Sequence, residues 1–203
     1  LNVWPHIIAE RACAYTHMDV RDADSFGKIT FNNEQLELEH LGHIVENDII
    51  RFALIKELEQ QPSATLMFDT EYQQIHQSES DVFITLKSGE PIIAKLLVAA
   101  DGANSAIRKQ FSMALSFKDY DHHALVATVK TKEPHANTAR QVFLPTGPLA
   151  FLPLSDANTH SIVWSTSPNH CDELLAMDDS AFNKAVMAAI DGQCGLCEVQ
   201  SAR

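Results

Sequence analysis

The chain has 203 residues, of which 45% are hydrophobic and 21% are charged, proportions typical of a soluble globular protein. Its formal net charge of −12 argues against non-specific nucleic-acid binding and against electrostatic attraction to anionic lipid, because both need a positive face. No apolar run approaches the roughly 20 residues of a membrane span, and no signal peptide is visible. The four cysteines, interpreted as reduced thiols, fit a cytoplasmic location.

The first part of the chain predicts a hairpin and then a connector. Residues 11–21 alternate loosely between polar and apolar side chains, residues 26–31 are rich in strand formers, and residues 22–25 between them are typical of a turn. Residues 34–40 carry three glutamates and are expected to form an exposed connector.

A short strand and a helix are predicted next. Residues 42–46 read as the strand, Asn47 is expected to cap the helix, and Pro62 is expected to end it after Gln60. Helical spacing predicts one apolar face made of Ile50, Phe52, Ala53, Leu54, Ile55 and Leu58.

Strand-like segments dominate the rest. Residues 64–68, 71–77 and 81–87 are expected to be strands, and the Ser88–Pro91 turn leads into a fourth at 92–100. After residue 117, four further strand-like segments separated by Pro and Gly turns predict an antiparallel sheet; they are 124–131, 140–144, 149–154 and 160–167. Helical spacing then predicts a helix over residues 178–190.

The cysteines and histidines carry little signal for a metal or redox site. Cys194 and Cys197 form a Cys-x-x-Cys pair, but Cys13 and Cys171 supply no second pair with the spacing of a zinc site. We therefore expect reduced, packed thiols and no bound metal.

One stretch, residues 96–108, organises the chain. Leu96–Ala100 is an unbroken apolar run that predicts a strand buried on both faces, and Asp101-Gly102 breaks it as a turn does. Asn104 or Ser105 can cap the helix that follows. A strand, a tight turn and a helix N-terminus would aim several backbone N–H groups at one point, which is a natural anion site.

A carboxylate is poorly suited to meet a phosphate directly. We therefore expect Asp101 to hold the loop, to meet a hydroxyl or to act through water, and Arg108 to fix the loop or reach an anion. An isolated Asp-Gly pair is most often only a turn, but the string Ala-Asp-Gly-Ala-Asn-Ser-x-x-Arg at residues 100–108 is far more specific.

That string resembles the Asp-Gly motif of the class A flavoprotein aromatic hydroxylases. The ubiquinone-biosynthesis hydroxylases are the most similar members, with bacterial hydroxylases of 2-octaprenylphenol as the nearest group, on the stretches 40–47, 119–129, 133–135, 139–143 and 150–156. The resemblance implies part of a para-hydroxybenzoate-hydroxylase-like α/β and α+β fold, which combines a portion of the FAD domain with an antiparallel substrate-domain sheet.

The resemblance also implies the domain limits. Residues 1–40 would be the substrate-domain hairpin and connector, residues 41–115 part of the FAD-binding domain, and residues 116–203 the substrate-binding sheet and helix. It further suggests an internal fragment of a longer protein, inactive by itself, because no Gly-x-Gly-x-x-Gly and no second flavin motif are present.

The implied cofactor is FAD, with NAD(P)H as co-substrate. The motif match would put Asp101, Gly102, Asn104 and Arg108 near the FAD pyrophosphate and the path of NAD(P)H. His43 lies just before a helix where several relatives carry a Gln that contacts the flavin; it can equally be a hydrogen-bonded packing residue.

The implied reaction is hydroxylation of a polyprenylphenol through a flavin hydroperoxide, in which the cofactor carries the hard step and no catalytic side chain needs naming. It needs an apolar wall that excludes water, and that wall is expected from Phe143, Leu149, Phe151, Leu152 and Trp164, each of which could instead be ordinary sheet core.

The expected partners are a polyprenylphenol and other ubiquinone-biosynthesis proteins, with contact at the inner-membrane surface and homo-oligomers both allowed. Two alternatives stay open: another flavin oxidoreductase of the same fold, and a non-catalytic module that binds a prenyl lipid or assembles partner enzymes.

Overall fold

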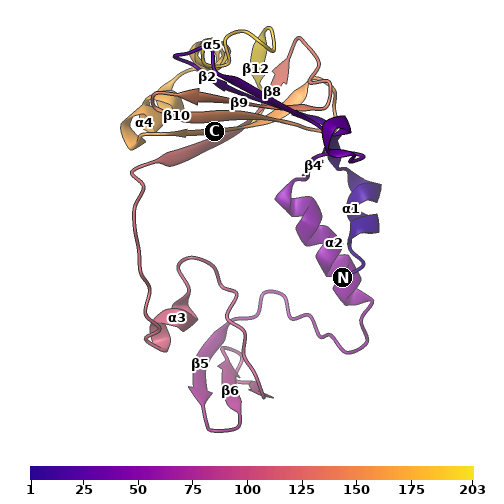
Figure 1. The fold of residues 1–203 in the computed structure, drawn as a ribbon. Coiled ribbons are helices and arrows are strands. Elements are labelled where there is room, and N and C mark those ends of the chain that lie inside the picture. The colour runs from indigo at the N-terminus through magenta and orange to yellow at the C-terminus, as the bar shows by residue number, and fades with distance from the viewer. The chain divides into compact units, whose positions relative to one another are not determined.

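The computed structural model describes all 203 residues, which divide into two compact units (Figure 1). The first comprises residues 1–57 and 119–203, and the second comprises residues 58–118. Residues 41–57 thus group with the first unit, whereas the sequence led us to place them with the flavin-binding portion. No helix is both long enough and apolar enough to cross a membrane.

The first unit is built on a seven-stranded sheet with the order β12-β8-β11-β10-β9-β2-β3. Neighbours pair antiparallel except β2 and β9, which run parallel. The bounds are β2 His17–Asp22, β3 Lys28–Asn32, β8 His123–Thr131, β9 Thr138–Leu144, β10 Gly147–Pro153, β11 Thr159–Thr166 and β12 Cys197–Val199. The predicted hairpin and the four predicted strands after residue 117 are therefore confirmed; β12 was not foreseen.

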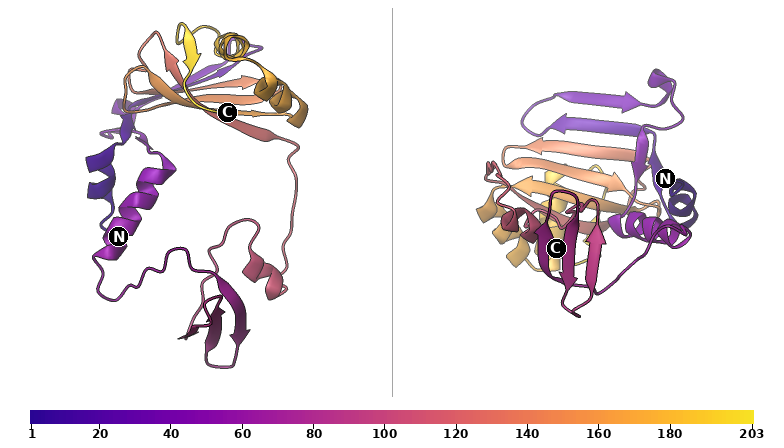
Figure 2. Two further views of the ribbon diagram at one scale, coloured as in Figure 1. Left: turned by 180° about the vertical axis from the view of Figure 1, so that it is seen from behind. Right: turned by 90° about the horizontal axis from the view of Figure 1, so that it is seen from below.

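Two helices, α4 (Pro168–Ala176) and α5 (Asp179–Ala189), cover one face of this sheet (Figure 2). The predicted helix over 178–190 is confirmed, with Asp178 as its cap, whereas α4 was missed. Sheet and helix side chains form one core, in which each buried large side chain is worth roughly 1.5–3 kcal/mol. Its fully buried members include Val129, Leu149, Phe151, Ile162, Leu174, Phe182, Val186 and Ile190.

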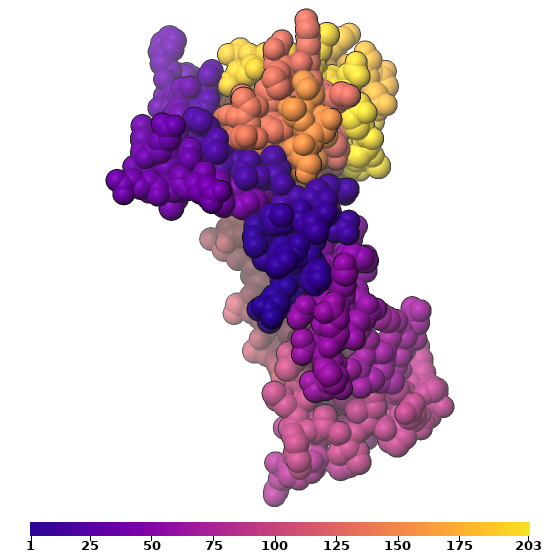
Figure 3. Space-filling model, turned by 90° about the vertical axis from the view of Figure 1, so that its right-hand side faces the viewer, coloured from indigo at the N-terminus to yellow at the C-terminus, as the bar shows by residue number.

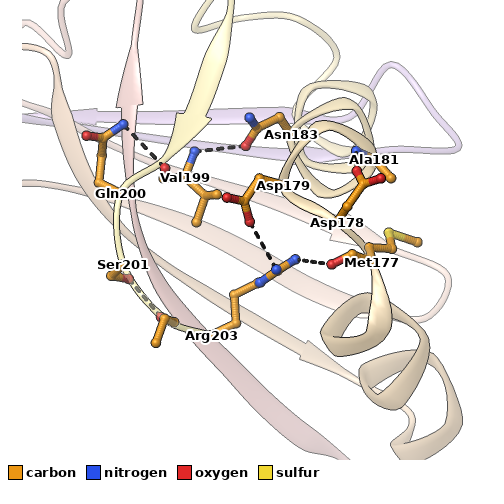
Figure 4. A network of polar contacts seen from close by, with 10 residues as sticks. Met177, Asp178, Asp179, Ala181, Asn183, Val199, Gln200, Ser201 and Arg203 are labelled. Carbon is orange, nitrogen blue, oxygen red and sulfur yellow. Dashed lines mark hydrogen bonds and ion pairs between the residues drawn. The ribbon is translucent and has the colours of Figure 1, made fainter.

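The C-terminal segment ties α5 to the sheet (Figure 4). The Val199 N–H donates to the side-chain oxygen of Asn183 at 2.8 Å. The guanidinium of Arg203 donates to the Met177 carbonyl at 2.9 Å and to the Asp179 carboxylate at 3.1 Å. These contacts fix the start of α5 against the edge strand β12.

A smaller layer of the first unit holds α1 (Trp4–Glu10), α2 (Asn47–Glu59), the 3₁₀ turn η1 (Glu34–Leu36) and the pair β1 (Cys13–Tyr15) and β4 (Gly42–Ile44). Its core joins Ile7 to Ile49 and Ala53. The predicted face of α2 was therefore largely wrong: only Ala53 of that set is buried, and Ile50, Phe52 and Leu58 are exposed.

The second unit contains a three-stranded antiparallel sheet, β5 (Tyr72–Gln77), β6 (Val82–Leu86) and β7 (Pro91–Ala94), and the short helix α3 (Ala106–Gln110). The predicted strand at 64–68 was wrong, because those residues are irregular and join no sheet. The predicted strand at 92–100 holds only as far as Ala94.

All four cysteines are free and buried, as expected for packed thiols. Burial raises the pKa of the Cys197 thiol to about 12, and the neighbouring Cys194 acts in the same direction. The thiols of Cys194 and Cys197 are therefore protonated at neutral pH, which makes them poor nucleophiles.

The cap of α5 gives a test of the fold. Asp178 accepts a hydrogen bond from the Ala181 N–H at 2.8 Å. Asp178→Ala removes this cap and should lower the free energy of unfolding by about 1 kcal/mol, measured by chemical denaturation. Asp172→Ala, an exposed acidic position on α4, is the control and should change it little. Equal losses in both variants would contradict the capping role.

Candidate functional site

The Asp-Gly corner lies in the second unit, between the apolar run and α3. The Asp101 carboxylate accepts the Ser105 hydroxyl at 2.6 Å and the backbone N–H groups of Ala106 and Ile107 at 2.9 and 3.3 Å. Ser105 caps α3 by accepting the Arg108 N–H at 2.9 Å. Asp101 therefore holds the loop and meets a hydroxyl, two of the roles that we expected for it.

Hydrogen bonds keep this carboxylate charged. The Ser105 hydroxyl lowers the pKa of Asp101 below its usual value, and the N–H groups of Ile107 and Ala106 lower it further. At neutral pH the corner thus carries a negative charge. A phosphate group would be repelled from that carboxylate, so an anion must approach the other side of the loop.

The free donors lie one turn earlier than the sequence suggested. The first N–H groups of α3 are already used by Asp101 and Ser105. The N–H groups of Gly102, Ala103 and Asn104 have no acceptor within the protein. Gly102 adopts a φ of +82°, and a Cβ there would meet nothing within 4 Å. The corner therefore presents three unpaired donors beside an open space.

Arg108 braces the same loop. Its guanidinium donates to the Ala103 carbonyl, which holds the loop against the helix. The side chain of Asn104 is exposed and makes no hydrogen bond within the protein. Of the four predicted motif residues, two thus shape the corner with their side chains, and Gly102 and Asn104 contribute backbone donors.

The apolar run before the corner differs from our prediction. Leu96 and Val98 are 76% and 75% exposed, and residues 96–100 pair with no strand of the chain. A strand can be buried on both faces only between neighbouring strands and covering layers, and this chain supplies neither. The run is instead one wall of an open cavity of about 430 Å³, which Ile107 and Phe111 of the α3 region also line.

His43 lies in the first unit, on β4, and is not part of the corner described above. Its ring packs edge-on against Trp4 at 4.8 Å and against His40 at 4.2 Å between centroids. Partial burial lowers the pKa of His43, and His40 lowers it further, so the ring is mainly neutral at pH 7. The contact with Trp4 could not be foreseen, because it joins segments that are distant in the sequence.

The five residues expected to line an apolar wall divide between the two faces of the sheet. Leu149, Phe151 and Trp164 point toward α4 and α5 and belong to the core. We therefore correct these three to core residues, because side chains alternate between faces along a strand. Phe143 and Leu152 lie on the opposite, open face, where Phe143 is 47% exposed.

The open face carries no ionised side chain over its centre. Cross-strand partners there include Phe143 with Pro148, Ala150 with Val163, Leu152 with Ser161 and Val126 with Val163. A neutral, mainly apolar surface of this kind suits an uncharged ring or hydrocarbon.

The sequence profile of the FAD-binding domain family matches residues 16–200. The chain belongs to this family of FAD-binding domains. Because the match covers most of the chain, the relevant question is whether the geometry of the corner suits FAD.

Curated relatives agree with this assignment. The chain is 41% identical over 199 residues to "Ubiquinone biosynthesis monooxygenase COQ6, mitochondrial" of Danio rerio, covering 93% of the chain and 41% of that protein. It is 33% identical over 178 residues to "3-demethoxyubiquinol 3-hydroxylase" of Escherichia coli, covering 88% and 45%. The resemblance to ubiquinone-biosynthesis hydroxylases is thus confirmed. The chain spans less than half the length of these relatives.

Solved structures confirm the fold class. The chain matches PqsL, a probable FAD-dependent monooxygenase from Pseudomonas aeruginosa, with a TM-score of 0.74 at 16% identity, covering 97% of the chain and 58% of that structure. It also matches p-nitrophenol 4-monooxygenase PnpA from Pseudomonas putida, with a TM-score of 0.67 at 13% identity, covering 96% and 51%. The narrower likeness to hydroxylases of 2-octaprenylphenol stays a prediction.

The corner fits the diphosphate of FAD. Three adjacent backbone donors without acceptors match a group that is rich in acceptor oxygens, and the missing Cβ of Gly102 leaves room for close approach. Sequence reasoning missed Ala103, because only its backbone takes part. Ser105 was visible in the sequence as a cap, but its bond to Asp101 was not.

The hydrogen bonds that Asp101 accepts from the start of α3 can be tested by hydrogen exchange. Asp101→Ala frees the N–H groups of Ala106 and Ile107, which should then exchange several-fold faster in a peptide that spans residues 101–110. Glu79→Ala, an exposed acidic position of the same unit, is the control and should leave that peptide unchanged. Unchanged exchange in Asp101→Ala would show that the carboxylate does not hold the helix start.

Proposed function

We propose that the protein containing this chain is a FAD-dependent monooxygenase that hydroxylates the aromatic ring of a polyprenylphenol in ubiquinone biosynthesis, with NAD(P)H and O₂ as co-substrates. The observation that carries the proposal is the braced corner at Gly102, whose three free donors face open space. The names of the curated relatives support the same reaction class.

The corner would bind the cofactor in a simple way. The N–H groups of residues 102–104 would donate to the diphosphate of FAD, and Asp101 and Arg108 would hold the loop so that those donors are already aligned. Bound FAD would supply the redox chemistry that delivers oxygen to the ring. Asp101 is thus a positioning residue, and its negative charge stays turned to α3.

The open face of the sheet would take the substrate. Its central side chains are neutral, so no charged group of the protein loses its hydration when an uncharged aromatic ring and a prenyl tail bind there. Phe143 and Leu152 would contact this substrate and exclude water. The neutral ring of His43, held by Trp4 and His40, remains a predicted flavin contact.

Such a substrate is a membrane lipid, so we also propose that the protein is cytoplasmic and contacts the inner-membrane surface. The negative charge of this chain argues that its contact with the membrane is apolar rather than electrostatic.

The decisive experiment uses the complete protein. Purified protein should contain FAD, should oxidise NAD(P)H in the presence of a short-chain polyprenylphenol, and should place one atom of labelled O₂ in the product. A complete protein that never binds flavin would end the proposal. NAD(P)H oxidation without labelled product would point to a flavin reductase instead.

Gly102→Ala tests the corner against a matched control. Gly102 and Gly89 both have positive φ, +82° and +88°, and a Cβ at either meets nothing within 4 Å. Alanine should therefore cost about 1 kcal/mol of folding stability at each position. Gly102→Ala should weaken FAD binding at least about tenfold, because the added methyl group occupies the space where the diphosphate must approach.

Gly89→Ala should leave FAD affinity unchanged, since Gly89 lies in the β6–β7 turn. Both affinities are measured by flavin fluorescence titration of the apoprotein. Equal FAD affinity in the two variants would contradict the proposed role of the corner.

Leu152→Asn tests the open face. A polar amide there should lower kcat/KM for a polyprenylphenol about tenfold, because its desolvation opposes contact with an apolar tail. Leu175→Asn is the control, since Leu175 is an exposed leucine on α4, which covers the other face of the sheet. FAD content should be unchanged in both variants. If both lower kcat/KM equally, the open face is not the substrate surface.

A further inference from the structure

Strand β3 forms one edge of the seven-stranded sheet and has a partner on one side only, as the right-hand view of Figure 2 shows. The Asp22 N–H donates to the Gly27 carbonyl at 3.1 Å, and the Asn33 N–H donates to the Thr16 carbonyl at 3.0 Å. Hydrogen-bonded pairs alternate along an antiparallel ladder. Residues 28, 30 and 32 therefore turn their N–H and C=O groups outward, away from β2.

The usual protection of an edge strand is absent here. A lysine or a bulky polar side chain can guard an edge. Lys28, however, pairs with Asp19 at 3.5 Å, and the Thr30 hydroxyl donates to Asp19 at 2.9 Å. Both side chains are thus drawn over the face of the sheet toward their β2 neighbour, and the backbone edge stays open.

An apolar strip accompanies this edge. Ile29 and Phe31 point to the other face of β3 and are 59% and 45% exposed. Leu36 and Leu38, a few residues further on, are also exposed, and Figure 3 shows the hairpin and the segment after it projecting at the surface of the unit. Large exposed apolar side chains beside free backbone groups mark a site of strand addition.

We propose that a second copy of the chain pairs with this edge, β3 against β3 in antiparallel orientation, with Thr30 on the two-fold axis. The three outward-facing positions are symmetric about Thr30: residue 30 meets residue 30 of the partner subunit, and residue 28 meets residue 32. Each strand then satisfies the donors and acceptors of the other, as an isologous interface requires.

The side chains support this register. It sets Ile29 opposite Phe31 of the partner subunit and joins the two apolar strips into one. A shift by one residue would separate these apolar partners and misalign the outward N–H and C=O groups.

The test uses the complete protein and the variant Thr30→Pro. Proline removes the outward N–H at the axis, and an edge strand tolerates it because β2 does not use that N–H. Wild-type protein should be a dimer in sedimentation equilibrium, and Thr30→Pro should raise the dimer dissociation constant at least about tenfold with unchanged circular dichroism. Thr30→Val loses only the hydroxyl bond to Asp19 and should remain a dimer.

A cross-linking variant keeps the proposal testable if the proline variant misfolds. Hydrogen-bonded antiparallel partners have Cα atoms about 5.5 Å apart, within the range of a disulfide. Thr30→Cys should therefore form a covalent dimer on mild oxidation. Glu198→Cys, at the opposite edge strand β12, should not. A monomeric wild type, a dimer that Thr30→Pro leaves intact, or no cross-linked dimer from Thr30→Cys would each overturn the proposal.

Discussion

The Asp-Gly corner depends on the hydrogen bonds that the Asp101 carboxylate accepts at the start of α3. Two backbone N–H groups of the helix donate to it, and so does the Ser105 hydroxyl. The Ser105 oxygen in turn accepts the N–H of Arg108. The free donors therefore lie on the loop before the helix and not at the helix end. The acidic residue thus organises the loop through the donors of α3 and leaves the N–H groups of residues 102–104 unpaired.

The sequence predicted the parts of this corner that side chains encode. Asp-Gly signals a turn, Ser105 signals a cap, and Arg108 lies one turn into the helix, so the local path followed from residue types. It could not identify the free donors at Ala103 and Asn104, because every residue has a backbone N–H. Only the set of bonds already made by Asp101 shows which donors remain.

The failed predictions share a physical cause. The run 96–100 has the composition of a buried strand, but its residues are largely exposed. Composition shows that a segment is apolar, and it does not show whether the chain supplies a neighbour that covers the segment. In α2, Ile49 and Ala53 face α1, whereas the more regular pattern of Ile50 and Leu58 faces solvent. Helical spacing allowed either stripe, and packing against Ile7 selected one of them.

The two faces of the large sheet show how one pattern serves two purposes. Along β10, Leu149 and Phe151 enter the core, whereas Ala150 and Leu152 between them do not. Strand periodicity separates these sets, but it does not reveal which set the helices cover, since both are apolar. The covering of one face by α4 and α5 leaves a second apolar face with no partner in the chain. The alternation of side chains along each strand therefore fixes two sets of residues, and the helices α4 and α5 decide which set becomes core.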